Sequence, residues 1–300
     1  MSKLMFVGDI HLNCGGFTPY VRDALNNVLQ IALEEEPDKL VFLGDFLDSP
    51  VLTPDLTSEM SERMSWFVSN IKNVYMLRGN HDRMPRYQSS SIDFLYRQRV
   101  ITKFDIMETD RMILISHSHS GVTVNPKNKI VAAHLGMSGI QVREGYEYNN
   151  SDVLTLEGKA EAIILGHIHT PTKIMWNETP LFVPGSICPT NWSDSSDQRF
   201  VVIVEDDNIR TRKIDHIFTK TVYSEEDIDP EDDTTIFRLV TTKEVDTSQY
   251  ENVKSVVVKK DIKPITKNLT KDSLIEQYCK QYNTNINKIK KILVEAGVHA

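Results

Sequence analysis

Five polar clusters along the chain hold the residue types that bind metal ions and move protons. Histidine is the commonest metal ligand, and carboxylate and amide oxygens complete many divalent-cation sites. Each cluster follows directly on a short apolar run. In chain order the clusters are Asp9-x-His11, Gly44-Asp45-Phe46-Leu47-Asp48, Gly79-Asn80-His81-Asp82, the single His134, and Gly166-His167-Ile168-His169.

The composition of these clusters indicates a particular kind of metal site. Residues i and i+2 of an extended segment point to the same side, so each D-x-H or H-x-H pair can aim two groups at one spot. Two carboxylates, one amide oxygen and four imidazoles suit a pair of first-row divalent cations such as Mn²⁺, Fe²⁺ or Zn²⁺. Mg²⁺ and Ca²⁺ prefer mostly oxygen, and without thiolates a structural zinc site is not expected. Two such cations can clamp a phosphate, which predicts phosphoester hydrolysis.

The apolar runs in front of the clusters predict buried strands. They are LMFV (4–7), KLVFL (39–43), VYML (74–77), ILIS (113–116), KIVAA (129–133), AIIL (162–165) and LFV (181–183). Helical patterns lie between the early runs, with one apolar stripe from Val21 to Ala32 and another from Leu56 to Ile71. This alternation predicts an α/β layered fold with the polar clusters at the carboxyl ends of strands, where ligand sites form.

Composition and charge limit the class of protein. Forty per cent apolar residues suffice for a large core, and no apolar run reaches the length of a membrane span. Cys14, Cys188 and Cys279 are far apart, which predicts no disulfide framework and a reducing compartment. The start MSKLMFVGDI lacks a secretory signal pattern, so we expect a cytoplasmic protein of a bacterium or a phage-infected host cell. The net charge of −8 argues mildly against broad nucleic-acid affinity but leaves room for a local basic face.

The series GDIH, GDFLD, GNHD, AH and GHIH resembles the calcineurin-like metallophosphoesterase superfamily over residues 1–205. Within it the match resembles most the SbcD-type DNA repair and recombination nuclease subunit, in its compact phage-encoded form. The features behind this are AHLGMSG (133–139), its spacing to GHIH, and PGS (184–186). The resemblance implies a two-sheet α/β sandwich with helices on the outer faces, plus a small capping sheet and a C-terminal helical hairpin.

The resemblance also implies roles for individual residues. One metal ion would be held by Asp9, His11 and His169, and a second by Asn80, His134 and His167, with Asp45 bridging both. His81 would contact the scissile phosphate and act as general acid for the leaving oxygen. Asp48 or Asp82 would accept a hydrogen bond from His81 or from a ligand histidine and so orient it. Two Mn²⁺ ions are the expected cofactors, with Fe²⁺ or Zn²⁺ as alternatives.

The ISHSHSGV segment (115–122) leaves one ligand open, because its His117 and His119 also follow an apolar run. The SbcD-type pattern favours His134, from its AHLGMSG context, and keeps His117 as the alternative ligand. His117 and His119 are then expected to be a hydrogen-bonded strand end near the site.

The character of the chain changes after residue 216. We predict a nuclease domain over 1–216, a small capping domain over 217–263 with strands at 236–242 and 253–260, and a helical extension over 264–300. By resemblance the extension would bind an SbcC-like ABC ATPase, although a helix pair used for packing or DNA contact fits the same residues. The helix over 56–71 would either serve the core alone or also form a homodimer interface.

Three functions remain in competition. The first is a Mn²⁺-dependent DNA exonuclease/endonuclease that works with the ATPase on DNA ends. The second is a small-molecule phosphodiesterase acting on cyclic or other nucleotides. The third is a non-catalytic scaffold that binds DNA ends. The Ser/Thr protein phosphatases of the same superfamily have an arginine after the second aspartate of GDxxD and a GNHE motif. Here Ser49 follows that aspartate and the motif is GNHD, so the resemblance disfavours a protein phosphatase.

Overall fold

The computed structural model describes residues 2–84, 89–143, 146–148, 151–194, 198–242, 245–248 and 250–258. The chain divides into two compact units, Met1–Leu239 with Thr247–Val256, and Val240–Asp246 with Val257–Ala300. The expected helical hairpin of residues 264–300 lies outside the described residues. No helix among the described residues is both long and apolar enough to cross a membrane.

The helices and strands lie close to the positions that the sequence pattern predicts. The helices are α1 (Thr18–Glu35), α2 (Pro54–Asn70) and the 3-10 helices η1 (Gly15–Phe17), η2 (Ser91–Gln98) and η3 (Glu225–Asp227). The strands are β1 (Leu4–Val7), β2 (Lys39–Phe42), β3 (Asn73–Met76), β4 (Val100–Ile101), β5 (Ile106–Glu108), β6 (Met112–Ile115), β7 (Val122–Val124), β8 (Ile130–Ala133), β9 (Gln141–Arg143), β10 (Tyr146–Glu147), β11 (Leu154–Leu156), β12 (Ala162–Leu165), β13 (Thr172–Trp176), β14 (Thr179–Val183), β15 (Phe200–Glu205), β16 (Asn208–Lys213), β17 (Phe218–Val222), β18 (Thr235–Thr241) and β19 (Val253–Val258).

The first large sheet has the strand order β16-β15-β1-β2-β3-β4. Strands β1 to β4 run parallel, so their carboxyl ends meet at one edge of the sheet. Strand β15 returns from much later in the chain and pairs antiparallel with β1. Helices α1 and α2 connect the parallel strands and bury their apolar stripes on this sheet; Thr53 caps the start of α2 by accepting a hydrogen bond from the amide of Leu56.

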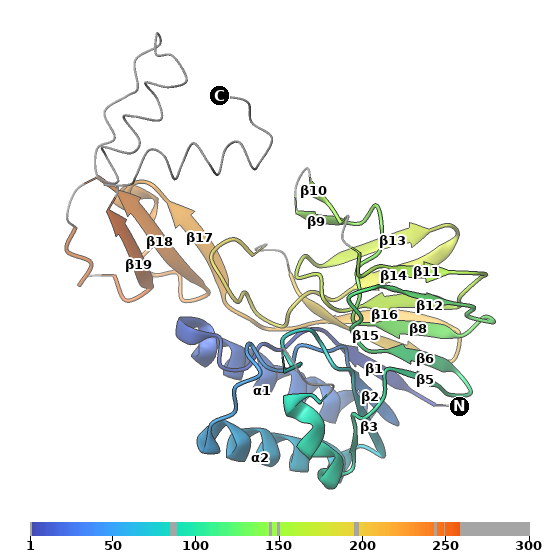
Figure 1. Cartoon of the computed structure of the whole chain (residues 1–300). Coiled ribbons are helices and arrows are strands. Elements are labelled where there is room, and N and C mark those ends of the chain that lie inside the picture. Colours follow the sequence, from blue (N-terminus) through green and yellow to red (C-terminus); the bar gives the residue numbers. More distant parts are fainter. Residues whose placement is uncertain are drawn as a thin grey trace, which may run out of the picture. The chain divides into compact units, whose positions relative to one another are not determined.

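The second large sheet has the order β13-β14-β12-β8-β6-β5. Its four central strands are parallel, and antiparallel strands form both edges. The whole second sheet lies between β4 and β15 in sequence, so it is an insertion between two parts of the first sheet (Figure 1).

The two sheets pack face to face, which confirms the predicted α/β sandwich. Phe6 and Val41 of the first sheet share one buried cluster with Leu114 and Ala132 of the second. The opposite face of the first sheet packs against α1 and α2.

The outer face of the second sheet differs from the expectation of helices on both outer faces. It is covered by the short parallel pair β7–β11 and by Tyr148 and Trp176, and the described part of the chain places no α-helix there. The reason lies in the connection between β8 and β12. It contains Gly136, Gly139 and Gly158, and it has no apolar residues at helical spacing over a long stretch.

A separate three-stranded sheet follows, in the order β17-β18-β19. Strands β18 and β19 lie within a residue or two of the predicted strands at 236–242 and 253–260. Strand β17, which pairs parallel with β18, was not predicted.

Candidate metal centre

The predicted ligands all sit where strands of the two large sheets end. Asp9 and His11 follow β1, Asp45 follows β2, and Asn80 follows β3 of the first sheet; in the second sheet, His134 follows β8 and the His167-x-His169 pair follows β12. The backbone N–H of His167 donates to Oδ2 of Asp9 over 2.9 Å, so the two sheets are joined directly at the site.

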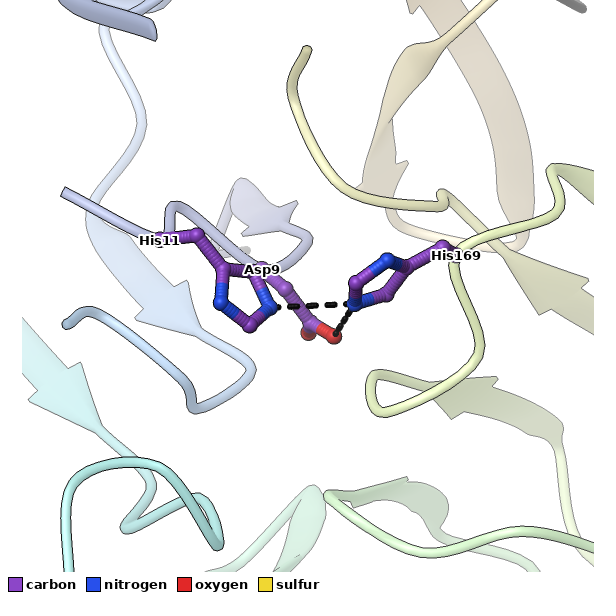
Figure 2. Close-up of side chains that lie close together, drawn as sticks. All are labelled: Asp9, His11 and His169. Carbon is purple, nitrogen blue, oxygen red and sulfur yellow. Dashed lines mark hydrogen bonds and ion pairs between the residues drawn. The ribbon is translucent and has the colours of Figure 1, made fainter. Parts of the chain in front are cut away.

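One group of side chains consists of Asp9, His11 and His169. Figure 2 shows the two imidazole rings approaching from opposite sides with the Asp9 carboxylate between them. Nε2 of His11 lies 3.0 Å from Nε2 of His169, which in turn lies 3.8 Å from Oδ2 of Asp9. Asp9 and His11 are buried, while the side chain of His169 is 25% exposed. This group is therefore open to solvent on the His169 side.

A second group consists of Asp45, His134 and His167, with Asn80 among them. Oδ1 of Asn80 lies 3.1 Å from Nε2 of His134 and 2.9 Å from Nδ1 of His167. Oδ2 of Asp45 lies 3.3 Å from Nε2 of His134 and 3.7 Å from Nε2 of His11. Asp45 thus lies between the two groups, within reach of both.

The hydrogen-bond pattern tests whether this donor set fits metal ions. Nδ1 of His134 faces the carbonyl oxygen of Leu43 at 2.7 Å and donates its proton there. Nε2 faces the oxygens of Asn80 and Asp45, which are both acceptors, so a positive charge belongs between them: the Nε2 proton supplies it in the metal-free protein, and a metal ion would supply it in place of that proton. Ligands about 2.1 Å from a metal ion stand roughly 3.0–3.4 Å apart, as these do.

The two groups therefore fit a binuclear divalent metal centre. The donors are imidazole nitrogens, carboxylate oxygens and one amide oxygen, the set that first-row divalent ions accept. Asp45 would bridge the two positions.

The same crowding of charge shifts the protonation of the metal-free site. Burial alone would lower the pKa of His134, but the carboxylates of Asp45 and Asp9 outweigh it and raise the pKa to about 9. Burial and the nearby charge of His134 lower the pKa of His167 to about 3. In the metal-free protein both ring nitrogens of His134 are therefore protonated below about pH 9, and metal binding has to displace the Nε2 proton.

Three ligand positions have left-handed backbones. The φ angle is 52° at His11, 43° at Asp45 and 74° at His167. Such conformations cost on the order of 1–3 kcal/mol each and persist only where surrounding contacts impose them. Two of those contacts are visible at Asp45, whose carbonyl oxygen accepts from the amides of Ile10 and His11. Each of the two groups therefore contains at least one residue with a strained backbone.

Two glycines permit the close approach of the strand ends. Gly44 has a φ of 107°, and a Cβ there would overlap Nδ1 of His134. A Cβ on Gly79 would overlap Oδ1 of Asp45. The glycines of the G-D and G-N-H-D clusters are therefore required by packing at the site.

His81 lies at the edge of the centre with a defined orientation. Its backbone N–H donates to Oδ1 of Asp45 over 2.8 Å, and its ring packs edge-on to His11 at a centroid distance of 4.9 Å. Nδ1 donates to the backbone oxygen of Asp48 over 2.7 Å, which leaves Nε2 as the atom available to a substrate.

The structure gives Asp48 and Asp82 different positions. Oδ1 of Asp48 lies 3.4 Å from Nδ1 of His11, next to a ligand histidine. Asp82 is fully buried and accepts from the backbone amides of Leu47 and Gly79, over 3.0 and 2.9 Å. Burial, reinforced by Asp45, raises the pKa of Asp82 to about 7. Rather than facing an imidazole, the Asp82 carboxylate ties together the turns that follow β2 and β3.

The structure places His134 and His117 differently relative to the two groups. His134 belongs to the second group, whereas His117 is buried beside it, with its ring 5.6 Å from that of His167. Nε2 of His117 lies 3.2 Å from Oδ2 of Asp152. His119, which follows His117, is exposed and packs edge-on against it.

The sequence interpretation missed three residues that contact the ligands. Oδ1 of Asp194 lies 3.4 Å from Nδ1 of His169, while Tyr148 and Asp152 both contact Nε2 of His167. None of the three stands in a motif or after a predicted strand, so no signal in the sequence distinguishes them.

Comparison with known proteins gives a family assignment. The model of the Calcineurin-like phosphoesterase family matches residues 2–171. No curated protein matches the chain. Among solved structures, the chain is similar to the Pseudomonas putida nuclease MPE, with 13% identity, 70% of this chain and 87% of that chain covered, and a TM-score of 0.37. It is also similar to Yfce, a phosphoesterase from E. coli, with 20% identity, 69% and 90% covered, and a TM-score of 0.37.

Proposed function

The chain belongs to the calcineurin-like phosphoesterase family and is a hydrolase of phosphoester bonds, and from this premise we propose that it is a Mn²⁺-dependent DNA exonuclease/endonuclease. The observation that carries the proposal is the pair of ligand groups sharing Asp45, with His81 held beside them. When bound, two divalent ions would polarise the phosphodiester and lower the pKa of an attacking water.

The protein's own residues would complete the reaction. His81 would protonate the leaving oxygen from Nε2, because Nδ1 is committed to the carbonyl oxygen of Asp48. Asp45 would hold the backbone of His81 at a constant distance from the metal positions. The opening at His169 provides an approach for the phosphate.

Several features support DNA as the substrate over a small phosphodiester. The chain continues over residues 170–300 beyond the last candidate ligand and forms the three-stranded sheet β17-β18-β19 in addition to the two large sheets. A pocket of about 360 Å³ adjoins the centre through His117; Arg83 and His119 also line it. It offers room for substrate beyond the scissile phosphate.

The proposal extends to partners and biological role. We propose processing of DNA ends in double-strand-break repair, recombination or replication, in company with an SbcC-like ABC ATPase that binds residues 264–300, and a homodimeric state. The AHLGMSG and PGS segments are the features in support.

A Mn²⁺-dependent assay on end-labelled single- and double-stranded DNA tests the proposal, with bis(p-nitrophenyl) phosphate and a 2′,3′-cyclic nucleotide run in parallel. We expect DNA cleavage that His81→Gln slows by about 10²–10⁴-fold and that His216→Gln, a change outside both ligand groups, retains. Efficient cleavage of the small esters with intact DNA would instead assign a small-molecule phosphodiesterase. DNA binding without any cleavage would assign a scaffold.

A further inference from the structure

The metal centre does not account for the buried His117 or for the side chains that gather around it. Oδ2 of Asp152 lies 3.2 Å from Nε2 of His117 and also 3.2 Å from Nε2 of His167. The hydroxyl of Tyr148 donates to Oδ1 of Asp152 over 2.6 Å and lies 2.9 Å from Nε2 of His167. The Asp152 carboxylate therefore contacts three side chains, and one of them, His167, is a candidate metal ligand.

The two ring nitrogens of His167 face different surroundings. Nδ1 lies 2.9 Å from Oδ1 of Asn80, on the side of the metal centre. Nε2 faces Asp152 and Tyr148, on the opposite side. If Nε2 carries the ring proton and donates it to these oxygens, Nδ1 keeps the lone pair that a metal ion requires.

The position of Tyr148 depends on a glycine of the AHLGMSG segment. A Cβ on Gly136 would overlap the Tyr148 ring, which is buried. The amide of Gly136 donates to the carbonyl oxygen of Asp152, and the amide of Leu154 donates to the carbonyl oxygen of Gly136. These backbone hydrogen bonds thus hold Asp152 next to the segment that follows β8 and carries His134.

We propose that Asp152, together with Tyr148 and His117, is a positioning group for His167, which it holds with Nδ1 directed at the second metal position. The inference rests on the proposed metal centre and deepens it. An outer carboxylate on a ligand imidazole fixes the tautomer, orients the ring and makes it a stronger ligand. Removing such a partner typically lowers metal affinity about 10–100-fold.

Mn²⁺ titration followed by calorimetry, with electron paramagnetic resonance to separate one bound ion from a coupled pair, tests the proposal. We expect Asp152→Asn to weaken one of two Mn²⁺ sites by about 10–100-fold and to leave the other near its wild-type affinity. Tyr148→Phe removes only a hydroxyl and should weaken the same site by a smaller factor. It replaces Asp152→Asn if that variant does not fold.

The chain offers a matched control on the other side of the centre. Asp194→Asn changes the carboxylate beside His169 and should affect the other metal position. Wild-type affinity at both positions in folded Asp152→Asn and Tyr148→Phe would overturn the inference while leaving the proposed function intact. A wild-type protein that binds no pair of divalent ions would instead contradict the metal centre itself.

Discussion

Replacing Gly44 by alanine should damage both the fold and the metal centre. Gly44 has a φ of 107°, where residues with a side chain are strained, and its missing Cβ leaves the space in which the His134 ring lies. Alanine must therefore change the backbone, displace the ring, or both.

The magnitude follows from these two effects. A side chain at such a φ costs on the order of 1–3 kcal/mol. Moving the ring also weakens its hydrogen bond to Leu43, which is worth about 0.5–1.5 kcal/mol. We expect Gly44→Ala to lower the free energy of unfolding by about 2–4 kcal/mol, which for a chain of this size is a fall in melting temperature of about 3–6 °C.

The same change should reduce metal binding, because a displaced His134 no longer faces Asn80 and Asp45. Thermal unfolding in chelator measures the effect on stability, and Mn²⁺ titration of the folded variant measures the effect on the site. We expect one ion to bind at least tenfold more weakly.

Gly16→Ala provides the matched control. A Cβ at Gly16 meets no atom within 4 Å, and its φ lies outside the left-handed range. It should leave metal binding unchanged and alter stability by less than about 1 kcal/mol. If Gly44→Ala melts at the same temperature as Gly16→Ala and binds two ions equally well, the reasoning about this close approach is refuted.

Three further outcomes follow. His81→Gln should lower kcat by about 10²–10⁴-fold with Mn²⁺ stoichiometry unchanged, measured by single-turnover cleavage; a lost metal ion would show that His81 acts as a ligand. Glu35 is buried and accepts hydrogen bonds from Arg210 and Arg212, which hold its pKa below the usual range despite burial. The ionised Glu35 therefore stabilises the folded state at pH values above its unfolded pKa of about 4.3. This stabilisation is lost as the pH falls through the lower pKa of Glu35 in the folded state. Glu35→Gln should cost about 1–3 kcal/mol at pH 7 and flatten urea midpoints between pH 5 and 3, whereas an unchanged acid slope would contradict the pairing. Removal of metal by a chelator should lower the melting temperature, since ions at about 100 times their Kd add about 2.7 kcal/mol; equal melting with and without Mn²⁺ would argue against binding to the folded state.

Local patterns were sufficient to predict the strands and the candidate ligands that follow them. Each short apolar run ends at a polar cluster, and parallel strands bring such ends together. The residues that the sequence interpretation proposed as ligands therefore lie together in the structure, Asn80 among them.

Contacts that form only when distant segments of the chain pair could not be predicted from the sequence. Strand β15 pairs with β1 across almost the whole domain, and no local period indicates that register. Asp82 was expected to face an imidazole, but its acceptors are filled by two backbone amides that meet only after β2 and β3 are side by side. Asp152 reaches His167 only through the packing around Gly136.

The insertion of the second sheet within the first has a consequence for how the chain is made. During synthesis, β1 to β4 emerge first, yet the partner of β1 on its other side is β15, which follows the entire second sheet. A nascent chain that has not reached Phe200 exposes one edge of β1, an edge open to pairing with another chain. It also holds ligands from both sheets on a scaffold that is not yet closed. Termination shortly before Phe200 should therefore give an aggregating product even though every ligand is present.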